Sequence, residues 1–441
     1  MSDAPLAPLG PLLGPGRELL AEIDEPGDIH AGPSLRAYAA ALIAERSTPL
    51  LVVVPTEKDA DGAADDLSAY LGADAVAVFP PWETLPHERL SPQPATVGQR
   101  LRVLDRLRAG DITAVVAPVR ALLQPMDPRL NERQPIRLDA AYGEGLDALV
   151  ECLAALGYTR TTMVEHRGEF AVRGGIVDVF PSAADHPVRV EFWGDDVDSI
   201  REFAAVNQRT LEPVNSVSID AARELVLDAE TADTARLLAK RVPALAEQLQ
   251  QLADGIGFEG MESLVTAIHP TPAYLPDFFP PQAGVAVIDP VRVADRATEL
   301  RDQAAALLVA GWGAHGATEG GFLLAGDEDA DTVGFAEWDA VQQRIAGPRW
   351  DITPFATPGA VLEVPGMPWD TFRGDIAAAA RHVRRLSADG LSVVLTTVGH
   401  GPALRLAEVL RDEGLAAPVV PSLEQLTPGA VVITESPLRE G

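Results

Sequence analysis

The stretch LLVVVPTEKDADGAADDLSAYL, residues 50–71, decides the fold class. Leu50–Val54 is an unbroken apolar run, which is typical of a parallel strand buried on both faces. The polar stretch 56–71 that follows has the spacing of an amphipathic helix. A buried strand joined to such a helix is the repeating unit of an α/β domain, so we expect a parallel sheet.

The same alternation continues on both sides of this stretch. Strands are expected at 75–79 and 112–117, with a helix at 97–108 between them. The apolar run 285–288 is expected to rejoin this sheet from far along the chain. Residues 1–27 are rich in Pro and Gly and predict an irregular lead-in.

The pattern changes after about residue 145. Short strands with alternating polarity are expected at 169–173, 176–180, 188–193 and 197–203, with glycine turns between them. They predict a small antiparallel insert. We therefore divide the chain into the first part of an α/β domain at 1–140, the insert at 141–214, the second part of the α/β domain at 215–345, and a third, small α/β domain at 346–441.

Composition limits the function classes. The 441 residues include 65 acidic and 35 basic side chains, a net charge of −30. A chain this acidic is a poor candidate for a broad phosphate-binding surface. The single cysteine, Cys152, excludes an intrachain disulfide and is expected in the core. With neither a signal peptide nor an apolar run long enough to cross a membrane, we expect a cytoplasmic protein without membrane contact.

A nucleotide site would be expected before the first buried strand. The residues there include Gly32, Ser34 and Arg36, but they lack the second glycine and the lysine of a phosphate-binding loop. After the strand 285–288, Asp289 is followed by proline rather than by a second acid, which favours a turn residue. The four residues therefore predict an inactive, degenerate nucleotide site with no cofactor.

The sequence gives equally little support for a nuclease site or another metal site. Asp178 and Glu191 lie on neighbouring expected strands, as the metal-binding acids of a nuclease would, but the lysine usual after the second acid is missing. We expect both carboxylates to face solvent. The eight histidines have no metal-ligand spacing, so we predict no metal site and no catalytic residues.

Strand alternation favours an interaction surface instead. In the strand 188–193, Arg189 and Trp193 lie opposite the apolar face, and Arg173 has the same position in the strand 169–173. If the strands pair in chain order, two arginines and a tryptophan share one exposed face. Arginine and tryptophan are enriched at binding hot spots. The alternative, a solvated face with a tryptophan over the sheet edge, stays open on this pattern.

Three segments of the insert, YTRTTMVEHRGEFAVRGGIVDVFP (158–181), PVRVEFWGDDVDSIREF (187–203) and QRTLEPV (208–214), resemble the module shared by UvrB and the transcription-repair coupling factors. Outside the insert, FPPWETLPHERLSPQPATVGQRLRVLDRL (79–107), GFEGMESLV (257–265) and TPAYLPDFFP (271–280) are similar to the coupling factors specifically. The chain is thereby identified as similar to their N-terminal, UvrB-like region.

The resemblance implies a degenerate helicase-like (RecA-like) domain without ATPase motifs, interrupted by a UvrA-binding insert. By motif, the UvrA contacts of the family fall on Arg173, Arg189 and Trp193. The family also implies RNA polymerase and double-stranded DNA as partners of the full-length protein, through domains expected beyond this chain. A monomeric, non-catalytic fragment that recruits UvrA is the leading hypothesis. The alternatives are a helicase-like domain that regulates motor domains in cis, or an ATP-dependent DNA helicase or nuclease relative.

Overall fold

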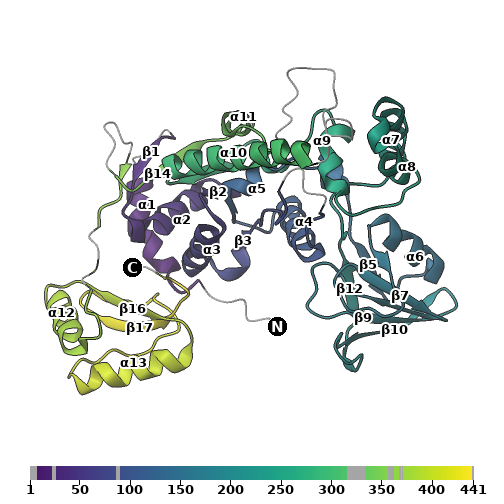
Figure 1. Ribbon diagram of the computed structural model, residues 1–441. Coiled ribbons are helices and arrows are strands. Elements are labelled where there is room, and N and C mark those ends of the chain that lie inside the picture. The colour runs from purple at the N-terminus through teal and green to yellow at the C-terminus, as the bar shows by residue number, and fades with distance from the viewer. Residues whose placement is uncertain are drawn as a thin grey trace.

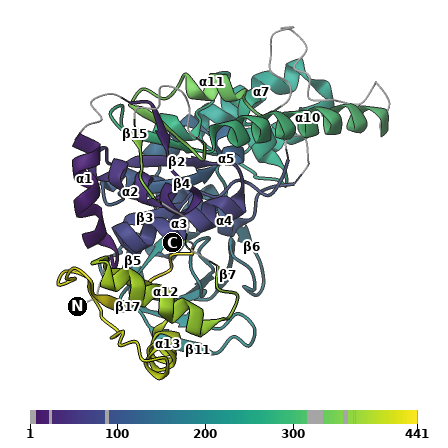
Figure 2. The same ribbon diagram turned by 90° about the vertical axis from the view of Figure 1, so that its left-hand side faces the viewer.

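The computed structural model describes residues 7–21, 26–85, 90–314, 334–355, 362–366, 369 and 371–439. Figure 1 shows a main α/β domain with a β-rich insert at one end and a C-terminal α/β unit at the other, and Figure 2 views the molecule from the side of the C-terminal unit. No helix within those ranges is long and apolar enough to cross a membrane.

The main domain contains a seven-stranded sheet in which every pair of neighbours runs parallel. Strand β2 carries the apolar run of the opening stretch and lies between β13 and β4, so the return of the chain to this sheet is confirmed. In spatial order the strands are β15 (Leu362–Glu363), β1 (Asp28–His30), β14 (Arg349–Thr353), β13 (Gly284–Ile288), β2 (Leu50–Val54), β4 (Ala114–Pro118) and β3 (Val76–Val78).

Helices cover both faces of this sheet, which explains why β2 is apolar at every position. Leu50, Val52 and Val54 belong to one buried cluster, and Leu51 and Val53 to the cluster on the other face. The first cluster includes residues of α1 (Leu13–Ala21), α2 (Arg36–Arg46) and α3 (Glu57–Leu71); the second includes residues of α4 (Pro94–Ala109), α5 (Val119–Leu123), α10 (Pro290–Ala314) and α11 (Trp338–Gln342).

The insert is a six-stranded sheet whose strands follow chain order and pair antiparallel, except for the parallel pair β6 and β7. Phe170, Val177 and Val190 on one face belong to the cluster that contains α4, so this face packs into the core of the main domain. The strands are β6 (Thr159–Arg160), β7 (Glu169–Arg173), β8 (Ile176–Val179), β9 (Val188–Trp193), β10 (Asp196–Phe203) and β11 (Thr210–Pro213), preceded by helix α6 (Gly145–Ala155).

The insert is attached to the main domain by paired strands and by a close backbone contact, among other contacts. The strands on either side of the insert, β5 (Ile136–Asp139) and β12 (Ser216–Ile219), pair with each other antiparallel. Gly98 of α4 lies against the turn after β8, where an added Cβ would be 2.7 Å from the backbone of Ser182 and Ala183. The insert therefore has a close backbone contact with α4 as well as a shared apolar core.

Two smaller units complete the chain. Between the insert and β13 in chain order, three helices form a separate apolar cluster: α7 (Ala229–Arg241), α8 (Ala246–Ala253) and α9 (Val265–Ile268). The C-terminal unit packs α12 (Ile376–Ala388) and α13 (His400–Asp412) on the parallel pair β16 (Val393–Thr397) and β17 (Val431–Glu435).

The structure corrects the sequence expectations for the lead-in, for Cys152 and for the start of the third domain. Residues 10–12 and 13–21 of the supposedly irregular lead-in are helical, because apolar Leu9 and Leu13 pack into the core. Cys152 is exposed rather than buried, since α6 directs Leu149 and Leu153 inward instead. Strands β14 and β15 lie beyond residue 345 yet pair into the main sheet, so we now place the start of the third α/β unit at α12.

Candidate functional site: the polar face of the insert

The β7–β8 hairpin is shaped by its glycine pair. Gly174 has φ +60°, in the left-handed region that glycine adopts without strain. Gly175 lies beside β9, where its carbonyl accepts a 2.8 Å hydrogen bond from the amide of Phe192 and an added Cβ would be 3.1 Å from the Phe192 carbonyl. The pair therefore makes a tight turn and lets β9 approach closely.

The register of the strands brings the predicted residues to one face. Arg173 is opposite Ile176, which is opposite Glu191, and Asp178 is opposite Arg189. Because in-register neighbours share a face and alternate residues repeat it, Arg173, Asp178, Arg189, Glu191 and Trp193 all belong to the face turned away from the main core. We call it the polar face. The predicted alternation is confirmed.

The exposures of the three predicted contact residues differ. Trp193 is 84% exposed. Arg173 is exposed, and its Nη2 donates a 2.7 Å hydrogen bond to the carbonyl oxygen of Thr162. Arg189 is largely covered, with 22% of its side chain exposed.

Asp178 is buried, which corrects the expectation of a solvent-facing carboxylate. It is 2% exposed and accepts hydrogen bonds from Arg189 Nε (2.6 Å) and Nη2 (2.8 Å). The Arg189 guanidinium also lies 4.9 Å from the centre of the Phe203 ring. A bidentate pair stacked on an aromatic ring holds the arginine in one orientation, and the bond to Asp178 raises the pKa of Arg189.

Part of the polar face is closed by a small apolar cluster. Val164, Ala171, Phe180 and Phe203 are buried together, with Val164 supplied by the loop before β7. Sequence reasoning missed both this cluster and the role of Asp178. A signal existed: VDV at 177–179 and VRV at 188–190 pair antiparallel, so their central acid and base had to meet.

The nuclease hypothesis gains no support from this geometry. Glu191 is half-buried, and its Oε1 lies 4.0 Å from Arg201 Nη1, while Asp178 is paired with Arg189. Both carboxylates thus have arginine partners. Among the described residues, no cluster of three or more His, Cys, Asp or Glu side chains could hold a metal ion.

The residues predicted to form a degenerate nucleotide site lie at the carboxyl edge of the main sheet, where parallel sheets bind ligands. Gly32 precedes a 3₁₀ turn containing Ser34, and it has φ −57°, which any residue adopts. Arg36 Nη1 at the start of α2 donates to Asp289 Oδ2 at 2.6 Å. Asp289 has φ +56°, as expected of a turn residue, but it is also only 5% exposed and is additionally bonded by Arg292.

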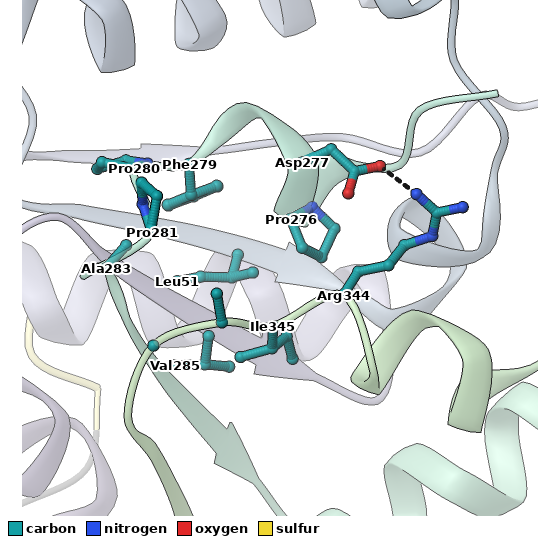
Figure 3. A pocket seen from close by; sticks show the side chains of 12 residues that line it. Leu51, Pro276, Asp277, Phe279, Pro280, Pro281, Ala283, Val285, Arg344 and Ile345 are labelled. Carbon is teal, nitrogen blue, oxygen red and sulfur yellow. Dashed lines mark hydrogen bonds and ion pairs between the residues drawn. The ribbon is translucent and has the colours of Figure 1, made fainter. Parts of the chain in front are cut away.

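A separate cavity of about 180 Å³ opens at the other edge of the sheet, near the amino ends of β2 and β13. Figure 3 shows apolar and proline side chains around it, with the ion pair of Asp277 and Arg344 at 2.7 Å. Arg344 also lies 4.7 Å from the Tyr274 ring centre. The two charged residues in the lining thus bind each other, and we assign no chemistry to this cavity.

Comparison with known proteins finds a family model that matches the insert and the strands on either side of it. The family model described as UvrB interaction domain matches residues 136–225. The match begins at the first residue of β5 and ends shortly after β12, so it includes the paired strands that flank the insert.

Relatives match almost the whole chain. The transcription-repair-coupling factor of Mycobacterium tuberculosis is 37% identical over 438 residues, 93% of this chain and 35% of that protein. The factor of Bacillus subtilis is 26% identical over 438 residues, with 93% and 36% covered. The factor of Escherichia coli is 31% identical over 194 residues, 44% of this chain and 17% of that protein. The chain spans about a third of the length of the first two relatives. With the UvrB interaction domain at 136–225 and the first two of these relatives along 93% of its length, the chain matches the N-terminal, UvrB-like region of the transcription-repair-coupling factors.

Proposed function

We propose that this chain recruits UvrA in transcription-coupled DNA repair, through the polar face of its insert. The observation that carries the proposal is that Arg173, Arg189 and Trp193 lie on one face of a sheet whose other face is buried in the main domain. Arg173 and Arg189 would donate hydrogen bonds to UvrA, and Trp193 would be buried in a UvrA pocket.

A titration of UvrA with the chain and its Trp193→Ala variant tests the proposal. We expect the variant to lose about 1–3 kcal/mol of binding free energy. Its thermal unfolding should be unchanged, because the Trp193 side chain is mostly in solvent. Arg160→Ala is the matched control. Arg160 is exposed on β6, and its register partner Phe170 belongs to the buried face. Equal affinities for the wild type and Trp193→Ala would contradict the proposal.

A second proposal concerns the main domain, which we infer to be a non-catalytic scaffold. The pair between Arg36 and Asp289 supports it, because Arg36 is bonded to the acid that a catalytic site would need for a metal ion or water. In the full-length protein this domain would regulate motor domains in cis. Turnover of ATP by the purified chain would contradict the non-catalytic assignment and revive the helicase alternative.

We further propose that the chain is cytoplasmic and monomeric, and that RNA polymerase and double-stranded DNA bind other parts of the full-length protein. The acidic composition, with a net charge of −30, is consistent with leaving duplex binding to other regions. Sedimentation analysis of the purified chain would test the monomeric state.

A further inference from the structure

The arginines of the polar face differ in what already binds them. Arg189 is paired with buried Asp178, and Arg201, which is opposite Arg189 in the register, lies 4.0 Å from Glu191. Arg173 instead donates to a neutral oxygen, the carbonyl of Thr162. Within the described strands β7–β10, Arg173 is thus the arginine of this face without a carboxylate partner.

The pair of Asp178 and Arg189 brings no net charge to the surface. Two N–H groups of the guanidinium bind the carboxylate, which leaves both N–H groups of Nη1 and one of Nη2 for a partner. A carboxylate that approached these donors would be repelled by the Asp178 charge directly behind them, where low polarity screens the repulsion poorly. A neutral acceptor meets no such repulsion.

We infer that the two arginines recognise different groups on the docking partner: Arg173 a carboxylate, and Arg189 a neutral oxygen such as a backbone carbonyl. Asp178 acts as the positioning residue that fixes the Arg189 guanidinium and cancels its charge. This inference rests on the proposed docking of UvrA, and it names the chemistry that the UvrA surface must present opposite each arginine.

The dependence of UvrA affinity on salt concentration separates the two roles, because salt screens an interaction between net charges much more than one with a neutral group. Arg173→Gln should weaken binding about tenfold at low salt, equivalent to about 1.4 kcal/mol, and should flatten the salt dependence. Arg189→Gln would leave buried Asp178 without its cation, so it is made together with Asp178→Asn. This double variant should weaken binding at every salt concentration and keep the wild-type salt dependence.

The single variant Asp178→Asn provides the sharpest test of the positioning role. It keeps the shape of the side chain but leaves Arg189 with a net charge. The carboxylate proposed opposite Arg173 would then attract two net charges on this face instead of one, so the salt dependence of UvrA binding should become steeper than in the wild type. A residue that only stabilised the fold would lower thermal stability without this change. Arg160→Gln, on the opposite face of the sheet, controls for the loss of one positive charge.

The outcomes separate the inference from the function on which it rests. If neither Arg173→Gln nor the double variant changes the affinity, the proposed docking function is wrong. If both weaken binding and both flatten the salt dependence, docking stands and the assignment of different groups is overturned. An unchanged salt dependence in Asp178→Asn would also overturn the role given to Asp178.

Discussion

Arg36 and Asp289, 253 residues apart in the chain, form a 2.6 Å ion pair at the carboxyl edge of the main sheet. One residue begins α2 and the other follows β13, the two positions where a nucleotide-binding domain of this type places its phosphate-binding loop and its metal-binding acid. The pair links two elements with side chains that a working nucleotide site would need free.

Removing the charge of Asp289 should destabilise the main domain. Asp289→Asn is the appropriate change, because asparagine tolerates the left-handed backbone at this position and only the ion pairs are lost. We expect the free energy of unfolding to fall by about 1–3 kcal/mol in urea titrations. Asp295→Asn, an exposed change on α10, serves as control. Equal stability of the two variants would contradict a structural role for the pair.

The ion pair of Arg100 and Glu224 should contribute much more to the free energy of unfolding than the pair of Arg36 and Asp289, because both of its side chains are fully buried. Trp82 Nε1 also donates to Glu224 at 3.0 Å, and the Arg100 guanidinium lies over the rings of Phe79 and Trp82. Glu224→Ala leaves a buried cation unpaired, so we expect a loss of about 3–5 kcal/mol by urea unfolding. The control is Glu299→Ala, which breaks the exposed ion pair between Glu299 and Arg296. It should cost less than about 1 kcal/mol of unfolding free energy. A similar cost for both would show that Arg100 finds another partner.

Asp220 should give the fold a measurable pH dependence. Burial, with a further contribution from Asp105, raises the pKa of Asp220 to about 6 in the folded state. The folded state therefore holds this proton more tightly than the unfolded chain. The stabilisation is complete below about pH 4 and is lost as the pH rises through about 6.

The variant Asp220→Asn should remove this dependence. Relative to the variant, the wild type should lose about 2–3 kcal/mol of unfolding free energy between pH 4 and pH 7, at about 1.4 kcal/mol for each pKa unit. Unfolding titrations of both proteins across this range measure the difference. The control is Asp198→Asn, an exposed change in the insert. Its unfolding free energy should have the same pH dependence as that of the wild type. A constant difference between the wild type and Asp220→Asn would contradict the assignment.

Gly98 should be intolerant of even one extra carbon. Gly98→Ala places a Cβ 2.7 Å from the backbone of Ser182 and Ala183, so the insert and α4 must separate. We expect a net loss of about 1–3 kcal/mol in thermal or urea unfolding, despite the better helix propensity of alanine. Gly401→Ala in α13 has open space around it and should be neutral or stabilising by up to about 1 kcal/mol. If Gly98→Ala stabilised the protein, the insert would have room to move away from α4, which would contradict a tight contact at this position.

The sequence predicted the elements whose signal is local. Leu50–Val54 and Val188–Trp193 were predicted with the bounds that the structure gives, because an unbroken apolar run and a strict alternation each determine how a strand is buried. Strand β1 was missed because Asp28–His30 is too short to show a pattern. Strands β14 and β15 were missed as members of the main sheet because membership depends on pairing between distant segments.

For the candidate site, too, the sequence predicted only the features that have a local signal. Alternation placed Arg173, Arg189 and Trp193 on one face under the assumption that the strands pair in chain order, since within each strand it needs only the parity of positions. The burial of Asp178 could not be read in this way, because it depends on the partner strand and on Phe203 packing against Arg189. A polar residue in a strand is therefore assigned to solvent or to an ion pair only once the register is known.

The antiparallel pairing of β5 with β12 has a consequence for how the insert is joined to its host. The chain leaves the main domain and returns to it on adjacent strands, so both covalent connections of the insert to its host run through one two-stranded stem. No strand of the insert belongs to the seven-stranded sheet, so the strand order of the host sheet is independent of the insert. The family model that matches it is named after UvrB, whereas the relatives of the whole chain are coupling factors. Under the proposed docking function, a second protein that carried the same insert would compete with this chain for the same partner.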